Sequence, residues 1–302
     1  MAKTELFVRK TSGGVFVINP ESNTTGNIFF VDSGSSTGGT SSGFGDNPDK
    51  PLTTIDSAIN RCTANNGDYI YVMAGHAETL STAAAIDFDV AGITVVGLGY
   101  GTDRPTITLD AVAADIDIDA ANTTIKNIVF VNDVDSLVAP LDVNAAHFTL
   151  ENCEMNDDTA AKQTVRWILG DASADYLTVR NCVNHGSDTA GATAWITLNG
   201  GDHVVVEDSS SHGDFSAANI ETVTAACTDA RFSRLHLENA NAVDVNIEGF
   251  SAQTGWISDC RLRIATNAQV TWVNTGGAMS LFENYGVNAD GEAGMIVGTS
   301  SS

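Results

Sequence analysis

Short apolar runs broken by Gly, Asn, Asp and Ala recur along most of this chain, and seven stretches share one pattern. Each stretch has an apolar residue, a polar residue, Asn or Asp, and then a small or apolar residue. In one of them Arg234 stands where the others carry Asn or Asp, and an eighth stretch at 95–98 fits upstream. The seven stretches are residues 125–128, 150–153, 179–182, 206–209, 232–235, 257–260 and 282–285.

These stretches follow one another at intervals of 25 to 30 residues from Gly97 onward. Self-similarity at such a period is typical of a solenoid, in which one coil cannot bury its apolar face without its neighbours. Three short strands per coil fit the period, with apolar side chains inside and polar ones outside. An Asn at the bend between two strands tolerates the left-handed backbone of a sharp corner. We therefore predict that Asn127, Asn152 and Asn181 lie in a single file along the stack.

One segment departs from the β-like pattern. Thr53 and Thr54 are good N-cap residues, apolar residues follow them at helical spacing, and Asn-Asn-Gly at 65–67 ends the run. We predict a capping helix over 54–64, which would cover the open strand edges of the first coil. The expected organisation is an N-terminal β arm over 1–32, a Gly/Ser-rich linker over 33–47, a β-helix over 48–290 and a tail over 291–302.

The charge of the chain is strongly acidic. Its 38 acidic residues outnumber the 14 basic ones, which gives a formal net charge of −24. Binding of nucleic acid requires clustered Lys and Arg, so we expect no nucleic-acid partner. The same charge disfavours anionic membrane surfaces and polyanionic substrates. We see no run of signal-peptide or membrane-spanning character and expect no membrane partner.

Five cysteines occur without the spacing of a metal site. Cys153, Cys182 and Cys260 share one repeat position, directly after the Asn or Asp. We interpret them as a stacked row of small buried thiols. A chain of this kind is expected to be made in a reducing cytoplasm and to need no disulfide.

The N-terminal part of the repeat region carries a family resemblance. The segment Pro-Leu-Thr-Thr-Ile at 51–55, then Gly-Asp-Tyr-Ile-Tyr-Val at 67–72 and Ala-Gly-His at 74–76, resembles the opening of pectate-lyase-like right-handed parallel β-helix proteins. The resemblance covers roughly residues 48–290. It implies an all-β fold, a single-stranded right-handed parallel β-helix. It leaves the activity open, because that superfamily includes lyases, hydrolases and inert virion proteins.

The layout of arm, linker and acidic coils is similar to β-helix proteins of tailed-phage particles. This resemblance implies a non-enzymatic virion protein, such as a capsid decoration or head-fibre protein, assembled in the host cytoplasm. It also implies a homotrimer that attaches to the major capsid protein or another virion protein through the N-terminal arm. The alternative is a tail spike or fibre that binds or degrades host surface polysaccharide as a lyase or glycoside hydrolase.

Aspartates recur at matching positions of the first coils. We expect Asp87, Asp117 and Asp142 to stack in one column, and Asp89 and Asp119 to stack in the next. Neighbouring strands lie about 4.8 Å apart, so ionised carboxylates in register repel unless they are solvated or bridged by a cation. We expect a solvated acidic face and no cofactor. The alternative is a Ca²⁺ site, since carboxylate oxygens suit that ion.

A second polar group follows the Asn/Cys position, in loops rich in His and Asp. Spaced carboxylates in such loops could reach the separation of about 6.5–9.5 Å that inverting glycosidases use. The Gly-His-Gly and Arg-Ile-Lys elements of the related hydrolases are missing, so we expect no catalytic residues. For an enzyme, the candidate residues are Asp158, His185, Asp188, His212 and Asp214.

Overall fold

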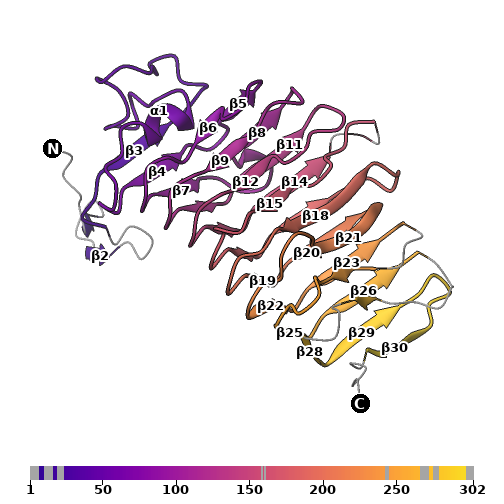
Figure 1. The fold of residues 1–302 in the computed structure, drawn as a ribbon. Coiled ribbons are helices and arrows are strands. Elements are labelled where there is room, and N and C mark those ends of the chain that lie inside the picture. Colours follow the sequence, from indigo (N-terminus) through magenta and orange to yellow (C-terminus); the bar gives the residue numbers. More distant parts are fainter. Residues whose placement is uncertain are drawn as a thin grey trace.

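The computed structural model describes residues 7–9, 16–18, 24–157, 159, 161–241, 245–265, 272–274 and 279–296. In these residues the chain forms a parallel β-helix, whose strands stack one above another from the N-terminal to the C-terminal end (Figure 1). The predicted all-β fold is confirmed, and the winding is consistent with the right-handed sense of parallel crossovers. Each coil passes in turn through sheet 1, sheet 2 and sheet 3, the names used below for its three parallel sheets.

Sheet 1 has ten strands in the described residues. They are β3 (Ile28–Val31), β4 (Tyr69–Val72), β7 (Thr94–Gly97), β10 (Thr124–Lys126), β13 (Thr149–Glu151), β16 (Thr178–Arg180), β19 (Val205–Glu207), β22 (Ala230–Ser233), β25 (Gly255–Ser258) and β28 (Met279–Phe282).

Sheet 2 follows the corner that carries the repeated Asn or Asp. Its strands are β5 (Ala77–Leu80), β8 (Thr106–Leu109), β11 (Val129–Asn132), β14 (Glu154–Asp157), β17 (Val183–His185), β20 (Ser210–Gly213), β23 (His236–Asn239), β26 (Arg261–Ile264), β29 (Asn284–Val287) and β30 (Ala293–Ile296).

Sheet 3 closes each coil. Its strands are β6 (Ile86–Asp87), β9 (Ile116–Ile118), β12 (Leu141–Val143), β15 (Ile168–Gly170), β18 (Ala192–Leu198), β21 (Phe215–Thr222), β24 (Ile247–Glu248) and β27 (Val273–Asn274). Separately, β1 (Phe7–Arg9) pairs antiparallel with β2 (Phe16–Ile18).

The predicted file of asparagines is confirmed at the corner between sheets 1 and 2. Asn127, Asn152 and Asn181 all have left-handed backbones, with φ of 57°, 54° and 53°. The Asn152 side-chain amide donates to Asn127 Oδ1 at 3.0 Å, and the Asn127 amide donates to the Gly97 carbonyl at 2.8 Å. The repeated Asn therefore supplies both a tolerated left-handed turn and a hydrogen bond between coils.

The last coil differs from the expected alignment by one residue. Phe282 pairs with Ser258, so Glu283 takes the corner position with φ of 51°. Asn284 instead points inward and is fully buried. Its amide donates to the Ile257 carbonyl at 2.8 Å, and its Oδ1 accepts from the Cys260 amide at 3.0 Å. The buried hydrogen bonds of Asn284 outweigh its preference for the corner.

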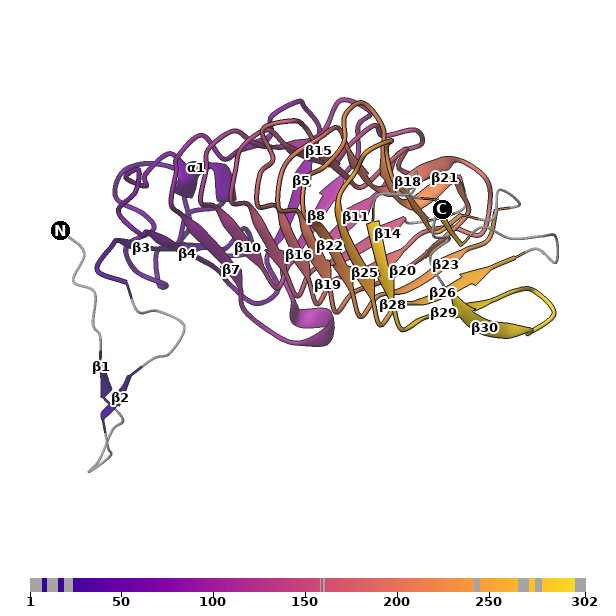
Figure 2. The same ribbon diagram turned by 60° about the horizontal axis from the view of Figure 1, so that its bottom comes forward.

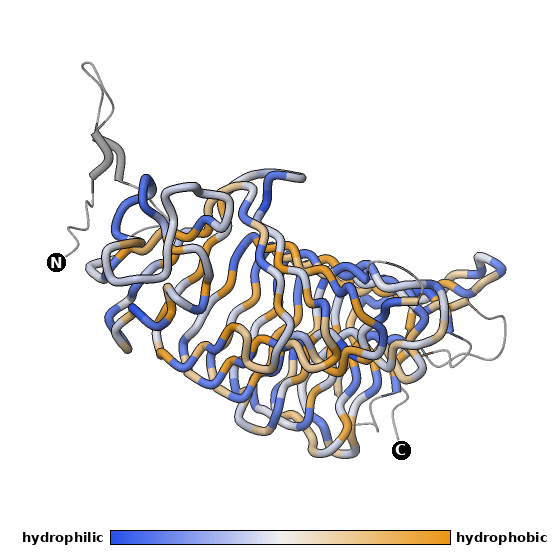
Figure 3. Tube along the Cα trace, turned by 90° about the horizontal axis from the view of Figure 1, so that it is seen from above, coloured by the Kyte–Doolittle hydropathy of each residue, from blue (hydrophilic) through white to orange (hydrophobic). Residues whose placement is uncertain are grey.

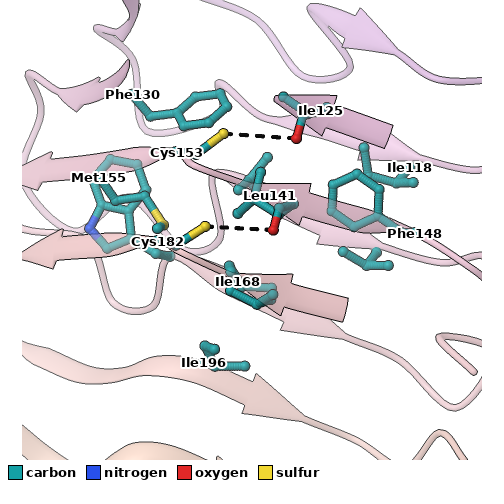
Figure 4. Close-up of a cluster of buried hydrophobic side chains, with 14 of the residues drawn as sticks. Ile118, Ile125, Phe130, Leu141, Phe148, Cys153, Met155, Ile168, Cys182 and Ile196 are labelled. Atoms are coloured by element: carbon teal, nitrogen blue, oxygen red, sulfur yellow. Dashed lines mark hydrogen bonds between the residues drawn. The ribbon is translucent and has the colours of Figure 1, made fainter. Parts of the chain in front are cut away.

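The core is a continuous apolar column that fills the space between the three sheets. Hydrophobic and hydrophilic positions alternate along the chain, as Figure 3 shows, which places every second strand residue inside. The prediction that Cys153, Cys182 and Cys260 are buried thiols is confirmed. Figure 4 shows Cys153 and Cys182 pointing into this column. Burial raises the pKa of Cys182, and it raises the pKa of Cys260 to about 11. These thiols are therefore protonated at neutral pH and are poor nucleophiles.

The predicted capping helix exists but is shorter than expected. Helix α1 (Ile55–Ile59) starts after the N-cap Thr54, whose hydroxyl accepts from the Ser57 amide. After Ile59 the amides of Arg61 and Cys62 bond to carbonyls three residues back, so the chain leaves the helix in tight turns. The side chains of Ile55, Ala58 and Ile59 are buried in the end of the core.

The boundaries at the N-terminal end differ from the expected arm and linker. Strand β3 was expected within the arm, but it pairs in parallel with β4 as the first strand of sheet 1. The Gly/Ser-rich segment packs on the same end, where the Phe30 amide donates to the Gly45 carbonyl and the Ser33 amide donates to His76 Nδ1. Backbone hydrogen bonds hold this segment because its small residues allow close approach to the first coil.

A buried carboxylate joins the segments of this end. Asp68 is fully buried and accepts hydrogen bonds from the Asn27 amide at 2.5 Å, the Asn66 side chain at 2.6 Å and the Thr63 amide at 2.7 Å. Such a carboxylate is tolerated inside because several donors surround it. At the opposite end, β30 runs antiparallel to β29 and covers an edge of sheet 2, within the segment expected to be a tail.

Candidate functional site

The predicted carboxylate column lies on the outer side of sheet 3. Asp87 pairs with Asp117, and Asp117 pairs with Asp142, in consecutive coils. The column continues through Leu169 and Thr197 to positions 221 and 248, which are both Glu. The predicted stacking of these aspartates is confirmed.

Partial burial and neighbouring carboxylates raise the pKa values of the aspartates in this column. Partial burial is the largest cause for Asp117, and the charges of Asp115, Asp142, Asp119 and Asp87 add to it, so that its pKa rises to about 6. The pKa values of Asp87 and Asp142 are raised for the same reasons.

In the neighbouring column, that of Asp89 and Asp119, an amide partly relieves the repulsion between carboxylates. The Asn144 side chain donates to Asp119 Oδ1 at 3.0 Å. Among the residues that the structure describes, no three His, Cys, Asp or Glu side chains form a group that could hold a metal ion. A solvated acidic face without a cofactor stays the prediction for this region, and calcium binding by Asp87, Asp89, Asp117, Asp119 and Asp142 stays its untested alternative.

The candidate catalytic residues lie on the outer side of sheet 2 and in the loops beyond it. His185 and His212 pair in adjacent coils, as expected from their spacing. His212 Nε2 lies 2.7 Å from Asp188 Oδ1, and its Nδ1 lies 3.7 Å from Glu238 Oε2. Asp214 instead accepts a hydrogen bond from the Asn241 side chain. Asp158 lies outside the described residues.

This group is open to water. The side chains of His212 and Asp188 are 40% and 71% exposed. Exposed charge pairs of this kind contribute at most about 1 kcal/mol. The group provides no water-excluded environment in which charges act strongly on a substrate.

A charge ladder that the sequence analysis missed lies on the outer side of sheet 1. The Lys126 ammonium and the Arg180 guanidinium lie 2.9 Å and 3.0 Å from Glu151 Oε2. Burial raises the pKa of Glu151, but these hydrogen bonds outweigh it and the pKa is lowered overall. The spacing of Lys126, Glu151, Arg180 and Glu207, each directly before the corner residue, carried the signal for this ladder.

Arg234, the departure from the Asn/Asp rule, belongs to the same system of ion pairs. Its guanidinium contacts Asp208 through Nε at 2.5 Å and Nη2 at 2.7 Å, and Nη2 also lies 2.7 Å from Glu207. The bidentate hydrogen bonds lower the pKa of Asp208. Arg234 keeps the left-handed corner backbone with φ of 53°, so an ion pair replaces the amide bond between coils.

A second file of left-handed residues lies at the turn between sheets 3 and 1, and the sequence analysis missed it as well. His147, Tyr176 and His203 occupy consecutive coils of this file. The Tyr176 ring stacks between the two imidazoles, with centroid distances of 4.5 Å and 4.7 Å and interplanar angles of 10°. Like the asparagine file, this stack connects consecutive coils at a left-handed corner, but it does so through contacts between aromatic rings.

A groove lies along the asparagine corner. It has a volume of about 740 Å³. One wall is the loop at 98–104, which contains the 3₁₀ turn η1 (Gly101–Asp103) and projects from the stack (Figure 2). The groove is lined by Tyr69, Val96, Gly97, Leu98, Gly99, Tyr100, Lys126, Asn127, Glu151, Asn152 and Asn181. The sequence predicts only a coil corner here, because its glycines give no measure of how far the loop projects.

Comparisons of this chain with family models, curated proteins and solved structures gave no match. In the described part of the chain, the helices are too short and too polar to cross a bilayer.

Proposed function

We propose that this chain is a non-enzymatic structural protein of a bacteriophage particle, a capsid decoration or head-fibre protein that projects an acidic β-helix into solvent. The observation that carries the proposal is the unbroken stack of coils. One core runs through it from Phe29 to Met279, and inter-coil hydrogen bonds and ion pairs reinforce the corner between sheets 1 and 2. Such a stack is a stiff rod, and its cysteines are free thiols, so no disulfide holds it together.

The charge of the chain supports the same role. A net charge of −24 keeps copies apart at high local concentration, as on the surface of a particle. We propose that the N-terminal arm attaches to a major capsid protein or another virion protein. We further propose that the rod functions as a homotrimer, with contacts on faces other than the acidic side of sheet 3.

Particle purification tests this function. Phage particles produced from a genome that encodes this chain would be banded on a density gradient and digested for quantitative mass spectrometry. We expect the chain in the particle band at a fixed ratio to the major capsid protein. A variant lacking residues 1–23, before the first coil, should remain folded but be lost from the band. Recovery of the full chain only from the soluble fraction would overturn the proposal.

The second candidate function is polysaccharide cleavage, which the placement of His212 between Asp188 and Glu238 favours. Reducing-sugar and unsaturated-product assays on polysaccharides from the host surface would test it. If this group is catalytic, His212→Ala should abolish product formation, while His147→Ala, at an exposed site on another face, should not. Product formation that survives His212→Ala would exclude this group as the active site.

A further inference from the structure

We infer that the groove along the asparagine corner binds a neutral oligosaccharide. This site is separate from the acidic column of sheet 3 and from the His212 group of sheet 2. It needs neither cleavage nor the attachment function proposed above.

The groove is built from a flat floor and a fixed wall. The outward residues of sheet 1 form the floor, among them Tyr69 and Val96. The wall is held in place by Asn127, whose amide donates to the carbonyls of Gly97 at 2.8 Å and Gly99 at 3.2 Å. A left-handed Gly99, with φ of 103°, makes the turn outward. The loop is thus positioned by the stack before any ligand arrives, which lowers the cost of binding.

Polar groups that suit sugar hydroxyls remain available at the rim. The amide of Asn152 donates to Asn127, which leaves the Asn152 oxygen as an acceptor. Within the described residues the Asn181 side chain has no hydrogen-bond partner, and both residues are exposed. An amide presents two donors and an acceptor, and a hydroxyl can pair with either kind.

An aromatic ring stands beside these amides. Tyr100 is 94% exposed at the tip of the loop, and it borders the groove on one side and a second hollow of about 580 Å³ on the other. Tyrosine is enriched at contact surfaces because its ring is apolar and its hydroxyl can form a hydrogen bond. The apolar C–H face of a pyranose can pack on such a ring while its hydroxyls reach the amides.

The charges in the groove favour a neutral ligand. Lys126 and Glu151 lie 2.9 Å apart and largely cancel. The protein as a whole repels polyanions through its net charge of −24. The groove is also long and open, since a third hollow continues from Asn181 to Arg234 along the same corner. Coils repeat every ~4.8 Å, about the length of one sugar residue in an extended chain, so successive coils can meet successive sugars.

Binding measurements on the full chain test this inference. The probes are maltotetraose, cellotetraose, tetra-N-acetylchitotetraose and a mannotetraose, titrated by calorimetry, with oligogalacturonate as the anionic comparison. We expect at least one neutral probe to bind and oligogalacturonate to bind more weakly or not at all. No product should form during the titration, which separates binding here from cleavage at His212.

Two variants locate the site. Tyr100→Ala should weaken binding at least tenfold, and Asn181→Asp, which keeps a residue that tolerates the left-handed corner, should weaken it about threefold. The matched control is Tyr285→Ala, since Tyr285 is also exposed (49%) but lies in the last coil. All three variants should melt within a few degrees of the parent. The inference is overturned if no neutral probe binds, if oligogalacturonate binds best, or if Tyr100→Ala binds as the parent does.

Discussion

The outer columns of sheet 1 and sheet 3 have the same backbone geometry and opposite electrostatics. In sheet 1, Lys126, Glu151 and Arg180 alternate in sign, and each neighbour is an ion-pair partner. In sheet 3, Asp87 and Asp117 stand at the same coil spacing with the same sign. A parallel solenoid forces equivalent residues over one another, so the sign at each repeat position decides whether a column attracts or repels itself.

The difference indicates that the outer faces of sheet 1 and sheet 3 have different roles. The sheet 1 column neutralises itself and stiffens the stack next to the groove. The sheet 3 column leaves its carboxylates unneutralised, with the pKa of Asp117 at about 6. Part of the stability of the fold is lost to the partial burial and mutual repulsion of these carboxylates. In return, the charged face resists association with other copies.

The largest effect should come from making sheet 1 resemble sheet 3. Glu151→Lys places three cations in consecutive coils and removes two ion pairs. We expect a loss of about 2 kcal/mol, seen as a melting temperature lower by about 5 °C. Glu151→Gln, which removes the pairs without adding repulsion, should lose about half as much. Equal melting temperatures for Glu151→Lys and the parent would mean that the ladder contributes nothing.

The reverse change should stabilise sheet 3. Asp117→Lys gives the column the alternation that sheet 1 has, since the new cation would lie between Asp87 and Asp142. We expect a gain of about 1 kcal/mol and a melting temperature higher by 2–3 °C at pH 7. Asp49→Lys makes the same change in net charge at an exposed site away from both columns, and it should gain less. A similar gain in the two variants would show that only net charge matters.

Mild acid should also stabilise the protein through this column. The folded pKa of Asp117 is about 6 and its ordinary value is 3.8, so between these pH values the folded state binds the proton more readily. The free energy of unfolding therefore rises as the pH falls through 6. Below pH 3.8 the Asp117 carboxyl group is protonated in both states and no longer destabilises the fold. Between pH 7.5 and 5.5 we expect the melting temperature to rise by about 2 °C, and by less in Asp117→Asn. An equal change in the melting temperatures of the two proteins would contradict this contribution from Asp117.

The smallest effect is that of salt. Screening weakens repulsion between partly exposed charges, so the gain from Asp117→Lys should shrink by about half between 0.02 and 0.2 M NaCl. Melting curves of parent and variant at the two salt concentrations would show it. A gain that does not depend on salt would point to packing of the lysine stem, not to charge.

Much of the fold follows from the repeat alone. The corner asparagines, the buried thiols and the stacked aspartates all lie where the spacing predicts, because a solenoid converts sequence intervals directly into vertical neighbours. The same intervals contained the Lys126–Glu151–Arg180 ladder and the His147–Tyr176–His203 stack, which pattern reading could have found. The predictions made from the repeat were wrong at the two ends of the stack, where Asn284 turns inward and β3 joins sheet 1. An end coil has a neighbouring coil on one side only, so the repeat constrains it less.

The groove could not be predicted from the sequence, for a different reason. Its wall depends on how far the loop at 98–104 projects, and that is set by the hydrogen bonds from Asn127 to Gly97 and Gly99. Glycines at these positions are compatible with a tight corner and with a projecting loop alike. The exposure of Tyr100 therefore appears only in three dimensions.

The contrast between the two columns is tested most directly by titrating individual carboxyl groups with ¹³C NMR. Asp117 should titrate with a pKa of about 6, and Glu151 below its ordinary value of 4.5. In Asp117→Lys, the pKa values of Asp87 and Asp142 should fall. Ordinary pKa values for both Asp117 and Glu151 would contradict the claim that stacking of the coils makes the sheet 3 column repulsive and the sheet 1 column attractive.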